Sequence, residues 1–192
     1  MDNSKTISES YRKANEWLHQ QPRGFGGDGG KHVEKALELI DTYNAKHLLD
    51  YGAGQCRLSY GLMMAQMGLE DKTWLTNYDP AIPLLSERPT YGHDLVFCTD
   101  VLEHIEPEYL DAVLADIRRL MGKAGYFVIC CQPANKTLPD GRNAHLIIEK
   151  PVWWLQKIQQ AGFIIKGVEL IPCKEAGKED QTKRMNIVLE PS

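Results

Sequence analysis

Several features that would place this chain of 192 residues in a specialised class are scarce or absent. Its five cysteines are an odd number with no C-x-x-C pair, and the adjacent Cys130 and Cys131 lie in an apolar run, where we expect buried thiols in a reducing compartment. No apolar stretch reaches the roughly 18 residues that cross a membrane, and the first ten residues lack an export signal's basic start and apolar run. We therefore expect a cytoplasmic protein that does not span a membrane.

The chain also lacks an excess of positive charge, internal repeats and a flexible linker. Its formal net charge of -4 disfavours broad nucleic-acid binding, which requires clustered Lys and Arg to neutralise phosphates. A chain of this length can bury a full core without disulfides or metal. We expect one domain over residues 1–192.

Helical and strand patterns alternate along the chain. Apolar spacing predicts helices at residues 9–21, 33–44, 57–66, 107–121 and 151–161, the fourth of them stopped by Gly122. Runs of β-forming residues predict strands at 46–51, 73–78, 95–99, 126–131, 163–170 and 185–189. Such alternation predicts a doubly wound α/β sheet whose ligand lies beyond the carboxyl ends of its strands.

A glycine loop follows the first predicted strand, in the run L-L-D-Y-G-A-G-Q-C-R-L. Gly52 and Gly54 allow the backbone to approach a ligand closely, and Asp79 ends the next strand, where its carboxylate can accept hydrogen bonds from both hydroxyls of a ribose. The alternative is a tight turn, with Asp79 capping the next helix. A dinucleotide site is disfavoured, because the loop lacks the third glycine of G-x-G-x-x-G and Asp50 would repel a pyrophosphate.

Three blocks resemble class I S-adenosylmethionine-dependent methyltransferases. They are Asp50-Tyr51-Gly52-Ala53-Gly54 with Asp79, the run D-L-V-F-C-T-D-V-L-E-H-I at residues 94–105, and N-A-H-L-I-I-E-K-P-V-W-W-L-Q-K-I-Q-Q-A-G-F at residues 143–163. The resemblance covers about residues 30–168. It implies a Rossmann-like methyltransferase sheet, mostly parallel with an antiparallel C-terminal strand, and S-adenosylmethionine as cofactor. The expected cofactor-binding residues are Asp50, Gly52, Ala53, Gly54, Asp79, Pro80, Thr99 and Asp100.

The chain departs from the family in the length of one connection. Only 14 residues separate Asp79 from Asp94, too few for the usual helix, strand and helix, so we expect the third strand to be lost or vestigial. The adenine would then rest near Ala81 and Ile82, with Thr99 or Asp100 opposite. In this interpretation, the N-terminal helix and glycine-rich segment of residues 1–30 form a lid over the cofactor.

The expected catalytic residues are His104, His145 and Glu103. In a helix, Asp100, Glu103 and His104 would share one face, which suits a helix cap or a His104 general base oriented by a carboxylate. A metal site is a less favoured third reading, because D-x-x-E-H resembles the E-x-x-E-H cluster with which ubiquinone-biosynthesis and small-RNA 2′-O-methyltransferases bind a divalent ion. His145 is a second candidate base, and its structural alternative is a loop histidine bonded to the backbone.

The sequence also lacks the motifs of base methylation. The position of an N/D-P-P-Y/F motif reads T-D-V-L, and no Pro-Cys nucleophile is present at Cys98. We expect O-methylation of a small-molecule acceptor, sugar-like or nucleotide-like. The alternatives are a metal-assisted methyltransferase of a nucleic-acid end or 2′-hydroxyl and a non-catalytic, cofactor-binding regulatory subunit. The acceptor, metal dependence and oligomeric state stay open.

Overall fold

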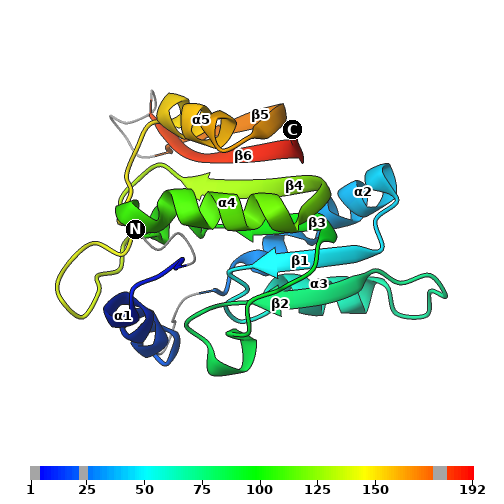
Figure 1. The fold of residues 1–192 in the computed structure, drawn as a ribbon, viewed down its shortest axis with the longest axis horizontal. Helices are drawn as coiled ribbons and strands as arrows, with labels where there is room; N and C mark the ends of the chain where they lie inside the picture. The colour runs from blue at the N-terminus through cyan, green and yellow to red at the C-terminus, as the bar shows by residue number, and fades with distance from the viewer. Residues whose placement is uncertain (1–4, 22–25, 175–180) are drawn as a thin grey trace.

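A six-stranded sheet forms the centre of the computed structural model, which describes residues 5–21, 26–174 and 181–192 (Figure 1). The strand order is β2-β1-β3-β4-β6-β5. The first four strands in this order are parallel, and β6 runs antiparallel to both of its neighbours. This confirms the predicted doubly wound sheet with an antiparallel C-terminal strand. The bounds are β1 His47–Tyr51, β2 Trp74–Tyr78, β3 His93–Thr99, β4 Met121–Cys130, β5 Phe163–Pro172 and β6 Thr182–Pro191.

Helices cover both faces of the sheet, because its central strands are apolar on both sides. Leu49 packs into the cluster that α4 and α5 cover, whereas its neighbour Leu48 packs into the cluster under α2 and α3. In Figure 1, α4 lies in front of the sheet and α3 behind it. No described helix is both long and apolar enough to cross a bilayer. The helices are α1 Glu9–His19, α2 Val33–Tyr43, α3 Arg57–Ala65, α4 Leu110–Leu120 and α5 Pro151–Gln160.

The connection from β2 to β3 lacks the third strand, as the sequence predicts. Residues 79–92, all of which the structure describes, form a 3₁₀ turn at Pro83–Leu85 and no strand, so β2 is an edge of the sheet. The buried carboxylate of Asp116 on α4 fixes the shortened connection. It lies 2.8 Å from Nη2 of Arg88 and accepts a hydrogen bond of 2.9 Å from the Tyr51 hydroxyl. The ion pair between Arg88 and Asp116 thus helps to hold the connection in which the third strand is missing.

The expected helix stop at Gly122 is wrong. Helix α4 ends at Leu120, and β4 begins at once with Met121, so Gly122 lies inside the strand. A Cβ at this position would lie 3.0 Å from the carbonyl oxygen of His93 on β3, where the register of the two strands shifts. The glycine therefore serves the close approach of two strands.

Candidate active site

A cavity of about 540 Å³ lies where the parallel strands end. Its walls come from the segments that follow β1, β2, β3 and β4, and from α1 and residues 26–29. A cavity of this size suits a cofactor and part of a small acceptor. The predicted site residues that line it are Asp50, Gly52, Ala53, Gly54, Asp79, Pro80, Thr99, Asp100, His104 and His145.

The glycine loop after β1 needs its glycines for two close contacts. Gly52 has φ +84°, and a Cβ there would lie 2.4 Å from Cγ2 of Val101. Gly54 has φ +49°, and its Cβ would lie 2.4 Å from the Cα of Gly26, whose carbonyl accepts a hydrogen bond of 3.2 Å from Gln55. Both backbone angles are unfavourable for residues with a side chain. The described end of the glycine-rich segment therefore packs directly on this loop.

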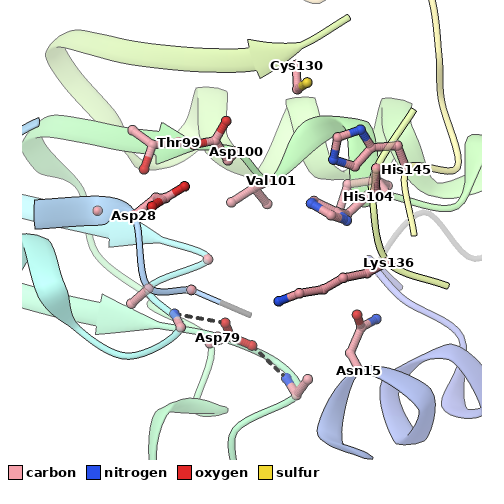
Figure 2. Close-up of a pocket in the computed structure, with 18 of the residues that line it drawn as sticks. Asn15, Asp28, Asp79, Thr99, Asp100, Val101, His104, Cys130, Lys136 and His145 are labelled. Atoms are coloured by element: carbon pink, nitrogen blue, oxygen red, sulfur yellow. Dashed lines mark hydrogen bonds between the residues drawn. The ribbon is translucent and has the colours of Figure 1, made fainter. Parts of the chain in front are cut away.

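Asp79 orders the same loop from the neighbouring strand. Its carboxylate accepts hydrogen bonds from the backbone N–H of Gly54 at 3.1 Å and of Ala81 at 3.0 Å (Figure 2). Nε2 of His19 on α1 lies 3.8 Å away. A carboxylate offers about four acceptor positions, so these two bonds fix its orientation and leave capacity for hydroxyl groups. The structural interpretation and the ligand-binding interpretation of Asp79 are therefore compatible.

Two further aspartates make this side of the cavity acidic. Burial, followed by the charge of Asp79, raises the pKa of Asp50 to about 7. Asp100 has a positive φ of +54°. Its pKa is raised, because burial raises it more than the positive charge of Arg184, 3.2 Å away, lowers it. Its Oδ2 atom is buried and has no hydrogen-bond partner among the described residues. A cationic ligand would stabilise the ionised forms of these carboxyls.

The helix expected after β3 is replaced by one 3₁₀ turn, Leu102–His104, so Asp100, Glu103 and His104 do not share a helical face. Glu103 is completely buried and does not line the cavity. Its Oε1 accepts a hydrogen bond of 2.8 Å from the backbone of Cys130, and Oε2 has no hydrogen-bond partner among the described residues. Burial raises the pKa of Glu103 to about 8. Glu103 therefore lies behind the residues that line the cavity.

The two candidate bases lie side by side. The ring centroids of His104 and His145 are 4.6 Å apart. Nδ1 of His104 lies 2.8 Å from the carbonyl of Ala144, and Nδ1 of His145 lies 2.6 Å from that of Gln132. Because a carbonyl only accepts, each Nδ1 carries the proton and each neutral ring keeps its lone pair on Nε2. Burial and the neighbouring His145 lower the pKa of His104 to about 3, and burial lowers that of His145 less severely.

A hairpin after β4 supports both histidines, and the sequence reasoning missed it. The backbone N–H of Ala144 donates to the carbonyl of Lys136 at 3.0 Å, and Thr137 pairs with Asn143. The Asn143 side chain accepts hydrogen bonds of 2.9 Å from the backbone of Ala134 and of His145. The turn sequence L-P-D-G between the two arms was the available signal. This hairpin carries Lys136 to the cavity wall.

Helix α1 closes the cavity over this hairpin. Tyr11 and Leu18 pack in one small apolar cluster with Leu138 of the hairpin. The Tyr11 hydroxyl donates a hydrogen bond of 2.5 Å to the carbonyl of His104. The N-terminal helix is therefore tied to the part of the site that holds the histidines.

A candidate metal-ligand group also exists, but it differs from the predicted D-x-x-E-H set. Ligand atoms of Glu103, Cys130 and His145 lie within 4.8 Å of one another. Cys130 and His145 line the cavity and Glu103 lies behind them. Imidazoles that donate their second N–H to a carbonyl are typical of metal sites. This donor set is chemically able to bind a transition metal.

In sequence comparisons, no protein-family model and no curated protein matches this chain. Solved structures do match. The 1,6-didemethyltoxoflavin-N1-methyltransferase of Burkholderia thailandensis, solved with S-adenosylhomocysteine, is 18% identical over 85% of this chain and 78% of that one, with a TM-score of 0.58. The magnesium protoporphyrin IX methyltransferase of Synechocystis PCC 6803, also solved with S-adenosylhomocysteine, is 15% identical over 93% and 94%, with a TM-score of 0.53.

The chain has the fold of class I S-adenosylmethionine-dependent methyltransferases. The predicted fold class is thereby confirmed. The same fold also includes a protein described as a cyclase, SpnF, which is 13% identical over 84% of this chain and 80% of that one, with a TM-score of 0.53. The fold therefore leaves the reaction to be argued from the site.

Proposed function

We propose that this protein is an S-adenosylmethionine-dependent methyltransferase (EC 2.1.1) that methylates an oxygen of a small, sugar-like or nucleotide-like acceptor. One observation carries the proposal. A single cavity joins a glycine loop and buried aspartates at one end with two neutral imidazoles at the other. The first set suits a ligand with a positive charge and a ribose, and the second suits proton removal from a hydroxyl.

The residues around the glycine loop fit the cofactor chemically. We assign the ribose hydroxyls to Asp79, the methionine portion to the backbone of residues 52–54, and the base to the side of Pro80 and Thr99. Asp50 and Asp100 would interact with the positively charged ammonium and sulfonium groups. Carboxyls whose pKa is raised by burial gain most from such a partner, since it favours their ionised form.

When bound, the cofactor supplies a methyl group activated by its sulfonium. The chain aligns the acceptor and takes up its proton, which are the contributions an enzyme makes to an in-line transfer. Bound there, the cofactor would give its methyl group to the acceptor oxygen and leave as S-adenosylhomocysteine, while Nε2 of His145 would take up the hydroxyl proton. We prefer His145 to His104 as the base because the lowered pKa of His104, about 3, makes it a weak proton acceptor.

Calorimetric titration with S-adenosylmethionine and S-adenosylhomocysteine tests this proposal. We expect micromolar binding to the wild type and a loss of about 1–3 kcal/mol in Asp79→Ala, the cost of losing hydrogen bonds to a charged group. Asp71→Ala is the matched control, because the side chain of Asp71 is 94% exposed and does not line the cavity. A folded wild type that binds neither compound would refute the proposal.

The group of Glu103, Cys130 and His145 favours one alternative, a metal-assisted methyltransferase of a nucleic-acid end or 2′-hydroxyl. In this alternative, chelator abolishes methyl transfer, a divalent ion restores it, and Cys130→Ser weakens the restoration. Under the main proposal, chelator leaves the rate unchanged. A thiolate ligand would favour zinc over magnesium.

A non-catalytic, cofactor-binding subunit is the alternative from another class. It predicts that the protein binds S-adenosylmethionine but produces no S-adenosylhomocysteine with any member of a broad acceptor panel. The paired neutral imidazoles in the cavity argue against it, because cofactor binding alone does not require them.

A further inference from the structure

The cavity has two halves of opposite character. Among the described residues that line it, all the carboxylates belong to Asp28, Asp50, Asp79 and Asp100, and we call this side the cofactor half. The opposite side, the acceptor half, carries Asn15, His104, Lys136 and His145. Figure 2 shows the labelled aspartates on one side and these four residues on the other. The two halves are therefore suited to ligands of different charge.

Lys136 holds a defined place in the acceptor half. Its side chain extends between His104 and Asn15 into the cavity (Figure 2). Its backbone carbonyl is held by Ala144, and the next residue, Thr137, pairs with Asn143, so the hairpin fixes where the side chain begins. The positive charge of Lys136 is one of the smaller causes that lower the pKa of His104, which agrees with their proximity.

The chemistry of the neighbours indicates what this ammonium group would bind. Among the described residues of the acceptor half, the two imidazoles are neutral and Asn15 is an amide, so none of these three side chains carries a negative charge. Arg184, which also lines the cavity, is paired with Asp100 in the cofactor half. Ammonium groups form strong, charge-assisted hydrogen bonds with carboxylate and phosphate oxygens. An anionic group on the ligand would complement this half.

We propose that Lys136 binds a carboxylate or phosphate group of the acceptor and thereby places the neighbouring hydroxyl beside His145. This inference rests on the proposed methyltransferase function and narrows its substrate class to anionic hydroxyl compounds. Lys136 is a specificity-determining residue in this view, and the base is a separate group. Substrate binding by Lys136 and proton removal by His145 would then both depend on the same short hairpin, which holds the two residues in place.

The test uses simple anions as probes of the acceptor half. The protein is saturated with S-adenosylhomocysteine, and its histidine ring signals are followed by NMR during titration with inorganic phosphate, acetate or neutral acetamide at constant ionic strength. We expect phosphate or acetate to shift the signals of His104 and His145 in the wild type. The comparison of the two anions distinguishes a phosphate from a carboxylate acceptor.

Three variants isolate the charge of Lys136. We expect Lys136→Gln to weaken anion binding at least about tenfold, the scale of a charge-assisted hydrogen bond, and Lys136→Arg to retain it. Lys183→Gln, an exposed lysine of β6 that also borders the cavity, should leave it within about twofold if a specific contact is involved. The thermal unfolding midpoint of each variant reports its folding.

The outcomes separate this inference from the function on which it rests. Failure of S-adenosylhomocysteine to bind the wild type would contradict the proposed function. Binding of S-adenosylhomocysteine without any response to phosphate or acetate would overturn the role of Lys136 alone. An equal response in wild type and Lys136→Gln would overturn it too, as would equal losses in Lys136→Gln and Lys183→Gln.

Discussion

The cofactor half and the acceptor half of the cavity are built in different ways. Apart from Asp28, the aspartates of the cofactor half lie at or just after the ends of parallel strands, and backbone N–H groups bonded to Asp79 order the glycine loop. The acceptor half combines His104, in the turn after β3, with a hairpin and a helix from other parts of the chain, which meet through Leu138 and Tyr11. The sheet can keep the first half constant while the second changes with the acceptor. The following predictions test this division.

The largest expected effect is that of removing the proposed base. His145→Asn keeps an N–H donor for the carbonyl of Gln132 but loses the basic nitrogen, so methyl transfer should fall by about 10²–10⁴. Binding of S-adenosylhomocysteine, measured by calorimetry, should be unchanged. His104→Asn is the matched variant and should lower the rate less. A larger loss in His104→Asn would make His104 the base and reverse our assignment.

A substitution in the glycine loop should instead weaken binding of S-adenosylhomocysteine. In Gly54→Ala, the new Cβ meets the backbone of Gly26 and the residue keeps an unfavourable φ of +49°. Strain of this kind costs about 1–3 kcal/mol, so affinity for S-adenosylhomocysteine should fall about 10- to 100-fold. Gly68 also has a positive φ, +89°, but nothing lies within 4 Å of a Cβ there, so Gly68→Ala should bind S-adenosylhomocysteine as the wild type does. Equal losses in both variants would point to general destabilisation.

The pH dependence of cofactor binding should come from the cofactor half. Asp50, whose pKa burial raises to about 7, is mostly neutral below that pH and ionised above it. The ionised form attracts a sulfonium, so the preference for S-adenosylmethionine over S-adenosylhomocysteine should increase from pH 6 to pH 8, by at most about tenfold. Asp50→Asn should remove the trend. A ratio of affinities that does not vary with pH in the wild type would contradict it.

The smallest change in cofactor affinity is expected when the packing of the acceptor half is weakened. Leu138→Ala removes a buried side chain between the hairpin and α1. Hydrogen exchange of the α1 amides should accelerate, because the cluster that holds the helix is small. Affinity for S-adenosylhomocysteine should change by no more than about threefold. A larger loss would mean that α1 is part of the cofactor half.

The sequence alone was sufficient to place the glycine loop and Asp79 at one edge of the sheet. Gly52, Gly54 and Asp79 could be identified because they follow predicted parallel strands, whose carboxyl ends meet at one edge of a sheet. The loss of the third strand followed from the length of residues 80–93, which cannot hold three more elements. Local pattern and chain length determine both features. The pattern could not reveal the pairing of Arg88 with Asp116, since it joins separate elements through side chains.

Tertiary structure decided the acceptor half. Position in the sequence suggested a helical face for Asp100, Glu103 and His104, but the positive φ of Asp100 and a single 3₁₀ turn direct Glu103 away from the cavity. The tautomer of His104 depends on a carbonyl 40 residues further along the chain. Side-chain patterns along a segment report its own period and burial. They do not show which distant backbone group will accept a hydrogen bond from a side chain of that segment, because only the folded chain brings the two groups together.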